Sequence, residues 1–421
     1  MKSNNKTLSI LTLILAGEAI FLLPFILMRV FRPIIRDALV ITDFEIGKAQ
    51  ALYGITAMAS YVFGGVLADK WEPRKLISLS LILTAIGGLF LMQIPSFAGL
   101  QLLYGFWGIS TILLFWAALI KATRLWGNAH NQGLSFGLLD GGRGAFAALV
   151  ATFGAMIPSF LFPEDSSTIT FEDKTKTLQY IIGFMTAVVL GVAFLVWKVL
   201  PDAEEQSESK SVDGRRIDFI ELLKIAGKPK VIFHALIIIC AYSTYKVTDV
   251  FATYAKDVWD YSLEESSAFG VYIQWIRPFA AIAVGWLADR FVTSKAVLLC
   301  FSLIVFGYVI LGFGIFEDYA IAISVLTFSL MAIGIYAMRG LYFALIEEAK
   351  TPLLVTGTII GIISFLGYTP DIFMSLISGY VLGDSPSITE YQKLFRIVLW
   401  FPVIGLLGTF AFRRVIKSSE N

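Results

Sequence analysis

The chain has 421 residues, of which 57% are hydrophobic and only 15% are charged, and its formal net charge is +1. This composition excludes an ordinary soluble domain, and the near-zero net charge gives no indication of a nucleic-acid partner. The two cysteines and two histidines are too few and too separated to indicate a disulfide framework or a metal site. The sequence therefore predicts an all-α integral membrane protein that needs no cofactor.

Apolar stretches of about 20 residues, the length that crosses a bilayer as a helix, recur along the chain. Strands of a membrane β-barrel would be about 10 residues long and would alternate in polarity, which these stretches do not. We predict twelve transmembrane helices, at about residues 8–31, 48–68, 76–94, 99–121, 134–162, 178–199, 231–255, 265–288, 296–316, 319–345, 354–381 and 394–412.

The loops between these spans predict the orientation. Lys and Arg are more frequent on the side that carries both termini, so we place both termini in the cytoplasm. The first span lacks a small-residue cleavage site, and we interpret it as a retained anchor. The expected location is the plasma (inner) membrane, with many passes.

The longest polar interruption is "PDAEEQSESKSVDGRRIDFIELLKIAGKPK", residues 201–230. It begins as a charged, Ser-rich segment, and its later part predicts a short amphipathic helix along the membrane surface. We therefore expect a six-helix bundle at 1–200, a cytoplasmic linker at 201–230 and a second six-helix bundle at 231–421.

A charged motif occurs once in each half, as "GVLADKWEPRK" at 65–75 and "GWLADRFVTSK" at 285–295. An ungapped offset of 220 residues aligns Gly65, Leu67, Ala68, Asp69, Lys70 and Lys75 with Gly285, Leu287, Ala288, Asp289, Arg290 and Lys295. An Asp at the end of a span can meet the positive N-terminus of a neighbouring helix, while the basic residues face cytosol. We interpret the motif as a cytoplasmic latch, against the alternative of a polar turn that only sets topology. The gating candidates are Asp69, Lys70, Arg74, Asp289 and Arg290.

These two segments resemble the loop signature of the major facilitator superfamily, and the twelve-span arrangement extends the resemblance over the whole chain. The resemblance implies two six-helix bundles related by a pseudo-two-fold axis, which alternately expose a central site.

A charge at bilayer depth costs at least about 2.5 to 3.5 kcal/mol, so each one needs a partner, a watery cavity or a role. The charges predicted to lie within spans are Glu18, Asp140, Arg143, Lys246, Asp249, Arg277, Arg339 and Asp371.

The fifth span contains "GLSFGLLDGGRG", which places Arg143 near the midplane. Asp140 lies three positions earlier on the same helix face and can pair with it. One interpretation is a structural ion pair, and the other is an arginine that binds substrate and is oriented by its aspartate.

The seventh span contains "YSTYKVTDVFATYAK" and suggests a polar cavity wall. Lys246 and Asp249 repeat the three-residue spacing, and Thr244 and Tyr245 add hydroxyl groups. The alternative is that Lys246 extends its amine to the outer surface.

The remaining charges are also open to two interpretations. Burial disfavours the charged form of Glu18, which makes it a candidate proton carrier or simply a hydrogen-bonded carboxyl. Arg29 either faces the cavity or caps the outer end of its helix, and Asp371 is either a proton site or a helix cap. Arg277 lies near the midplane before Pro278. Arg339 and Glu347 suit a gating salt bridge at the inner half of span ten.

The run "MRVFRPIIRDAL…FEIGKAQALYGITAMASYVFGGVLADKWEPRK" is similar to the organophosphate:phosphate antiporters. In that family two arginines and a histidine hold the phosphoryl group. The first arginine falls on Arg29, the histidine on Arg143 and the second arginine on Thr244, while a family aspartate matches Asp249. The segments "RLWGNAHNQGLSFGLLDGGRG" and "RGLYFALIEE…GYTPDIF" resemble poorly characterised bacterial facilitators instead.

Several mid-depth cations favour an anionic cargo, because guanidinium groups bind carboxylate or phosphate in a bidentate way. We predict a monomeric secondary carrier, not an enzyme, that moves a small organic anion with a proton or counter-anion, as a symporter or antiporter. Alternatives are a sugar-phosphate or sugar-acid antiporter and a multidrug or lipid exporter. The predicted substrate-binding residues are Arg29, Arg143, Arg277, Lys246, Tyr245 and Thr244. The proton-coupling candidates are Glu18, Asp140, Asp249 and Asp371.

Overall fold

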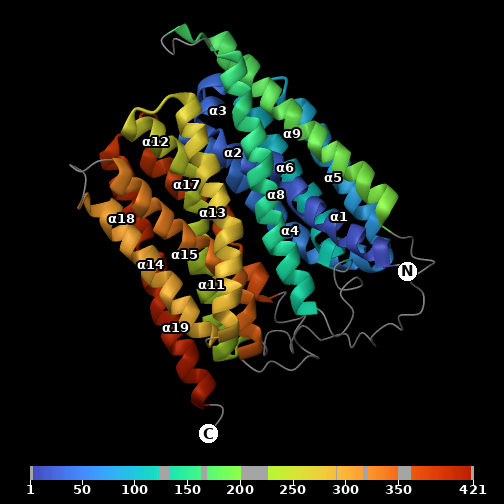
Figure 1. The fold of residues 1–421 in the computed structure, drawn as a ribbon, viewed down its shortest axis with the longest axis vertical. Coiled ribbons are helices and arrows are strands. Elements are labelled where there is room, and N and C mark those ends of the chain that lie inside the picture. Colours follow the sequence, from blue (N-terminus) through green and yellow to red (C-terminus); the bar gives the residue numbers. More distant parts are fainter. Residues whose placement is uncertain are drawn as a thin grey trace. The chain divides into compact units, whose positions relative to one another are not determined.

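The computed structural model describes residues 3–120, 122, 132–162, 168–200, 226–290, 292–315, 321–348 and 362–418. Within these residues every regular element is a helix, which confirms the predicted all-α class. Figure 1 shows the long helices in chain order from blue to red.

The helices of the first half begin near the N-terminus and end just before the predicted linker. They are α1 (Ser3–Phe21), η1 (Leu22–Ile26), α2 (Leu27–Val30), α3 (Arg32–Leu39), α4 (Asp43–Lys70), α5 (Pro73–Leu91), α6 (Phe97–Thr111), η2 (Ile112–Trp116), α8 (Gln132–Leu161) and α9 (Phe171–Val199).

The described helices of the second half begin at the end of the predicted linker. They are α11 (Pro229–Val247), η5 (Thr248–Val250), α12 (Phe251–Trp259), α13 (Leu263–Arg290), α14 (Thr293–Phe313), α15 (Ile321–Glu348), α17 (Pro370–Leu382), α18 (Ile388–Val398) and α19 (Trp400–Ser418).

Local sequence fixes where several of these helices begin. Thr42 precedes α4 and forms a capping box with Glu45: the Thr42 side chain accepts from the Glu45 amide, and the Glu45 carboxylate accepts from the Thr42 amide. Thr170 and Asp173 do the same before α9. Such boxes satisfy amides that the first helical turn leaves without partners.

The described residues contain ten helical segments that are long and apolar enough to cross a membrane, and each falls on a predicted span. The predicted second and eighth spans correspond to α4 and α13, which are 28 residues long each. The chain is therefore an integral, multi-pass membrane protein.

The chain folds into two compact units. Unit 1 contains Met1–Asp202, Val247–Pro278 and Asp371–Tyr391, and unit 2 contains Ala203–Lys246, Phe279–Pro370 and Gln392–Asn421. Parts of the second half thus pack within unit 1. The predicted linker and its amphipathic helix lie outside the described residues as far as residue 225, and the predicted division into two bundles stays a prediction.

The interior of unit 1 is mainly apolar, and several of its buried polar groups are hydrogen-bonded. In Figure 1, α5 and α9 run alongside α1, and α4 packs on α6. The buried Trp107 donates its indole N–H to the carbonyl of Thr84 at 3.2 Å, and the buried Tyr104 donates to the carbonyl of Pro24 at 3.1 Å. These bonds offset the cost of burying a donor.

Candidate substrate site and closure

The buried carboxylate of Glu18, on α1, binds two arginines from other helices. Its Oε2 accepts from Nε of Arg143 on α8 at 3.1 Å, and its Oε1 accepts from Nη1 of Arg277 on α13 at 2.9 Å. The three side chains are between 3% and 7% exposed. Because buried charges are stable only when paired, this acid holds both guanidinium groups in place. In their ionised forms these three side chains have formal charges of −1, +1 and +1.

Two glycines, Gly17 and Gly144, pack directly against the side chains of these arginines. A Cβ on Gly17 would lie 3.1 Å from Cδ of Arg143, and a Cβ on Gly144 would lie 3.0 Å from Cγ of Arg277. Both distances are tighter than ordinary van der Waals contact, so a side chain at either position would displace the arginine. Gly141, on the same helix as Gly144, would meet nothing within 4 Å. The glycine run in α8 thus serves close approach at particular positions.

Aromatic rings surround the Arg143 guanidinium. Its carbon lies 5.5 Å from the ring centroid of Phe21 and 5.9 Å from that of Trp116, within the range of cation–π attraction. Phe21 also contacts Phe25, and Phe25 packs edge-on against Tyr53 with ring centroids 4.8 Å apart. These residues come from α1, η1, η2 and α4, so four elements meet beside the arginine.

Both helices that supply these rings depart from regular α geometry at this level. Leu22–Ile26 and Ile112–Trp116 are π-helical turns, and the first contains Pro24, which has no amide hydrogen to donate. Single π turns inside α-helices are rare and occur frequently at functional sites.

The face of the first span that carries Glu18 changes along its length. Leu8 and Leu11 are 45% and 50% exposed, and Phe21 and Phe25, on the Glu18 side of the helix, are partly exposed. Every side chain from residue 26 to residue 35 is buried. Between residues 16 and 35, Phe21 and Phe25 are the two partly exposed side chains.

Beyond Phe25 lies a buried ion pair between Arg29 and Asp249. Oδ1 of Asp249 accepts from Nε of Arg29 at 2.8 Å and is 2.6 Å from Nη2. The side chains are 2% and 4% exposed. Asp249 lies in η5, a short 3₁₀ turn between α11 and α12, so both partners sit at breaks in their spans.

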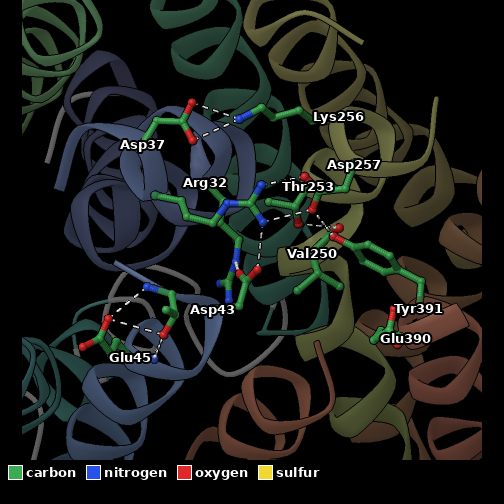
Figure 2. Close-up of polar contacts among 12 residues, drawn as sticks. Arg32, Asp37, Asp43, Glu45, Val250, Thr253, Lys256, Asp257, Glu390 and Tyr391 are labelled. Carbon is green, nitrogen blue, oxygen red and sulfur yellow. Dashed lines mark hydrogen bonds and ion pairs between the residues drawn. The ribbon is translucent and has the colours of Figure 1, made fainter. Parts of the chain in front are cut away.

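Further charges close the end of unit 1 that contains α3, which we call the α3 end. Asp43 accepts from Nε of Arg32 at 2.6 Å and from Nη1 of Arg36 at 3.1 Å. Arg36 also binds Asp257 through both terminal nitrogens, at 3.0 and 2.5 Å. Figure 2 shows Tyr391 donating its hydroxyl to the same carboxylate, at 2.9 Å. The contacts of Arg36 with Asp257 and Asp43 outweigh its burial and raise its pKa above the ordinary value.

A second group at the α3 end centres on Asp37. Lys256 binds both of its oxygens, at 3.0 and 2.9 Å, and Lys174 binds one at 2.8 Å (Figure 2 draws the Lys256 contacts). Burial by itself would raise the pKa of Asp37, but the hydrogen bonds and charges of the two lysines outweigh it and hold the pKa below its usual range. Asp37 is therefore charged near neutral pH.

The helices α4 and α17 touch through glycines near the same end. A Cβ on Gly54 would lie 2.8 Å from the backbone carbon of Asp371, and a Cβ on Gly379 would lie 2.6 Å from Cα of Phe44. A Cβ atom essentially never lies within 3.0 Å of a backbone atom of another segment, so only glycine allows the two helices to approach this closely. Asp371 lies in the first turn of α17, where the helix dipole favours a negative charge.

Three predicted binding residues lie in unit 2. The guanidinium of Arg339, a predicted gating residue, lies over the ring of Tyr245. Its central carbon is 4.1 Å from the ring centroid. Thr244 donates its hydroxyl to the carbonyl of Ala241 at 2.7 Å. Lys246 is buried.

The side chains of six predicted residues lie outside those that the structure describes: Asp140, Asp69, Lys70, Asp289, Arg290 and Glu347. Arg74 lies over the ring of Trp197, with its guanidinium carbon 4.7 Å from the centroid. Glu348, which follows the predicted gating residue, accepts from the amide and hydroxyl of Ser294 at 2.7 and 2.6 Å. It thereby binds the start of α14, within the second copy of the charged motif.

The ion pairs of the α3 end were not predicted, although the sequence contains a signal for them. The offset of 220 residues that aligns the two charged loops also aligns Arg36 with Lys256 and Asp37 with Asp257. Adjacent opposite charges therefore recur at matched positions, and in the structure they bind across the repeat. The same offset aligns Arg29 with Asp249.

The chain is similar to known membrane proteins along nearly its whole length. The family model described as Major Facilitator Superfamily matches residues 8–375. The inner membrane protein YqcE of Escherichia coli (strain K12) is 25% identical over 375 residues, which cover 88% of this chain and 86% of that protein. The inner membrane protein YihN of the same organism is 25% identical over 400 residues, which cover 93% and 92%.

Solved structures share the fold. A D-xylose–proton symporter has a TM-score of 0.75 at 12% identity and covers 97% of this chain and 96% of its own. A bacterial homologue of the human lysosomal transporter Spinster, inward-facing and unoccupied, has a TM-score of 0.71 at 15% identity and covers 99% and 98%. At such identities these structures support the fold alone.

Proposed function

This chain belongs to the Major Facilitator Superfamily, and on that premise we propose that it is a secondary active transporter for a small organic anion. In this proposal the anion binds Arg143 and Arg277, a proton travels on Glu18, and the two ends of the transporter open alternately.

The observation that carries the proposal is the sharing of one carboxylate by two arginines. Arg143 and Arg277 hold Glu18 between them at a buried position, and the formal charges of these three ionised side chains sum to +1. Guanidinium groups bind carboxylates and phosphates strongly where water is scarce. An incoming anion would thus be favoured by the excess charge.

Glu18 offers a way to couple that anion to a proton. A charged Glu18 competes with an anionic substrate, because both seek the same guanidinium groups. A protonated Glu18 no longer compensates them and so favours the substrate. Proton and anion therefore assist each other's binding, and this assistance is reciprocal by thermodynamic linkage. Such coupling predicts symport.

The contacts beyond Phe25 suit the closed side of an alternating-access cycle. Arg29 with Asp249 and Arg36 with Asp257 join segments from the two halves of the sequence. With both termini in the cytoplasm, as the loop charges predict, these contacts close the outer side. Arg29, a predicted binding residue, belongs to this closure in the present state.

The test uses the purified full-length protein and a panel of carboxylates, sulfonates and sugar phosphates. A ligand that binds only the folded protein raises its melting temperature by mass action. We expect one anion class to stabilise the wild type more strongly at pH 6 than at pH 8. Arg143→Ala should lose the shift, and Glu18→Gln should keep the shift but lose its pH dependence. Arg414→Ala, at an exposed arginine of α19, is the matched control.

Transport is tested separately in liposomes that trap a pH indicator. A gradient of the stabilising anion should move protons in the same direction, and protein-free liposomes give the background. If no anion stabilises the wild type, or if Arg143→Ala binds as the wild type does, the proposal is wrong.

A further inference from the structure

The surroundings of Arg143 indicate what the rest of an anion would touch. An acid group bound to this arginine places the adjoining atoms within a few ångströms of its guanidinium. The rings already at that distance are Phe21 and Trp116, and both are partly exposed. Neither carries a hydroxyl group.

These rings also lie where accessibility ends. Phe25, in η1, is the last partly exposed residue before the buried stretch 26–35, and its ring contacts that of the buried Tyr53 edge-on. The Tyr53 hydroxyl is bonded to that of Thr111 at 2.8 Å. A molecule bound at Arg143 would thus have the rings of Phe21, Phe25 and Tyr53 on the side toward the buried stretch of the first span.

The two π-helical turns are a second, independent observation. Phe21 directly precedes the turn Leu22–Ile26, and Trp116 is the last residue of the turn Ile112–Trp116. Ordinary packing of aromatic side chains between spans does not require such irregular turns. Their occurrence next to two rings that lie close to the same arginine is typical of a functional site.

We propose that the substrate is an aromatic carboxylate, whose acid group binds Arg143 and whose ring lies against Phe21 and Trp116. This inference rests on the proposed function, since it names the class of anion that the same site takes. Ring pairs in offset or edge-to-face arrangement bind more tightly than their buried area alone predicts.

The same surroundings disfavour sugar acids and sugar phosphates, the alternatives raised from the sequence. Their hydroxyl groups lose water on binding and need hydrogen-bond partners. Side chains of phenylalanine offer none, and Trp116 offers one indole N–H. A polyhydroxylated anion beside these rings would therefore bind weakly.

The experiment compares three carboxylates in the thermal-shift assay: phenylacetate, cyclohexylacetate and gluconate. The first two have the same acid and similar size but differ in aromaticity, and the third carries hydroxyl groups. We expect apparent affinity to be about threefold to tenfold higher for phenylacetate than for cyclohexylacetate. Gluconate should give no shift.

Variants then locate the ring. Phe21→Leu and Trp116→Leu should each bring the ratio of phenylacetate affinity to cyclohexylacetate affinity close to one. Cyclohexylacetate should still bind to both variants. Phe153→Leu is the matched control, since Phe153 lies on α8 like Arg143 but is 57% exposed. If one of the two variants fails to fold, the other and the ligand comparison in the wild type decide.

The outcomes separate this inference from the proposed function. Equal binding of phenylacetate and cyclohexylacetate, or strong binding of gluconate, overturns the aromatic class while anion transport stands. A preference unchanged in Phe21→Leu and Trp116→Leu also overturns it. If no anion of any class binds, the proposed function itself is wrong.

Discussion

Arg29 and Asp249 are bound to each other although 220 residues separate them, and that separation equals the offset of the internal repeat. They are therefore equivalent positions of the two halves, with opposite charges. Nearby, Arg36 binds Asp257 and Asp37 binds Lys256, so each repeat donates one cation and one anion to the other. This crossed pattern is that of a two-fold interface, in which residue i contacts j and the equivalent of j contacts the equivalent of i.

Equivalence of the two positions predicts that the charges can be exchanged. Arg29→Asp or Asp249→Arg alone places like charges in a buried site and should cost about 3 to 5 kcal/mol of stability. The double variant Arg29→Asp/Asp249→Arg restores a pair in a nearly symmetric setting and should recover most of that loss. Melting temperatures of the four proteins form a double-mutant cycle. Additive losses in the double variant would refute direct coupling.

The glycine contact between α4 and α17 should control access at the α3 end. Gly54→Val puts a branched side chain against the backbone of Asp371 and should favour the state that is open there. A cysteine at Ala38, which is 1% exposed on α3, would report the opening by reacting faster with a membrane-impermeant thiol reagent. We expect an increase of at least about tenfold, because a shift of about 1.4 kcal/mol suffices.

Gly191→Val provides the matched control for that experiment. A Cβ at Gly191 would meet nothing within 4 Å, so the variant adds the same volume without a clash. Equal reactivity of the Ala38 reporter in Gly54→Val and Gly191→Val would contradict a gating role for the contact.

The spans were predictable because length and polarity alone decide whether a helix can cross a bilayer. The depth of Arg143 and Arg277 follows from helical rise for the same reason. Their partner did not follow, since residues at equal depth on different helices can face any direction. Asp140, on the same helix, was the expected partner of Arg143 and its side chain lies outside those described, so that pairing stays a prediction, while the Glu18 contact from α1 was not expected.

The α3 end shows a different limit of the sequence. Arg36 and Asp37 lie at the end of a span, where charged residues are common and need no special role. Their importance appears only when the repeat offset is applied to them and the two halves are brought together. The irregular turns at Leu22–Ile26 and Ile112–Trp116 had only Pro24 as a local signal, and Ile112–Trp116 contains no proline or glycine.

Asp37 predicts how the α3 end depends on pH. Its folded-state pKa is lowered, so its contribution to stability is present above the unfolded pKa of about 3.9 and is lost as pH falls below it. The melting temperature of the wild type should exceed that of Asp37→Asn by a constant amount between pH 5 and 8. This corresponds to about 1 kcal/mol in the free energy of unfolding. The difference should shrink as the pH falls below about 3.9 and vanish only below the lowered pKa of the folded state. A difference that changes between pH 6 and 8 would point to another titrating group.

Two glycine variants of α8 distinguish an effect on the position of Arg277 from an effect on the helix itself. Gly144→Ala places a methyl group 3.0 Å from Cγ of Arg277 and should displace its guanidinium from Glu18. We expect anion affinity to fall about tenfold or more, and the melting temperature without ligand to fall as well, because the displaced guanidinium loses its buried partner. Gly141→Ala adds the same methyl group on the same helix into open space and should bind anions as the wild type does. Both are measured by ligand-dependent thermal shift, and an equal loss in the two variants would show that helix geometry matters here rather than the placement of Arg277.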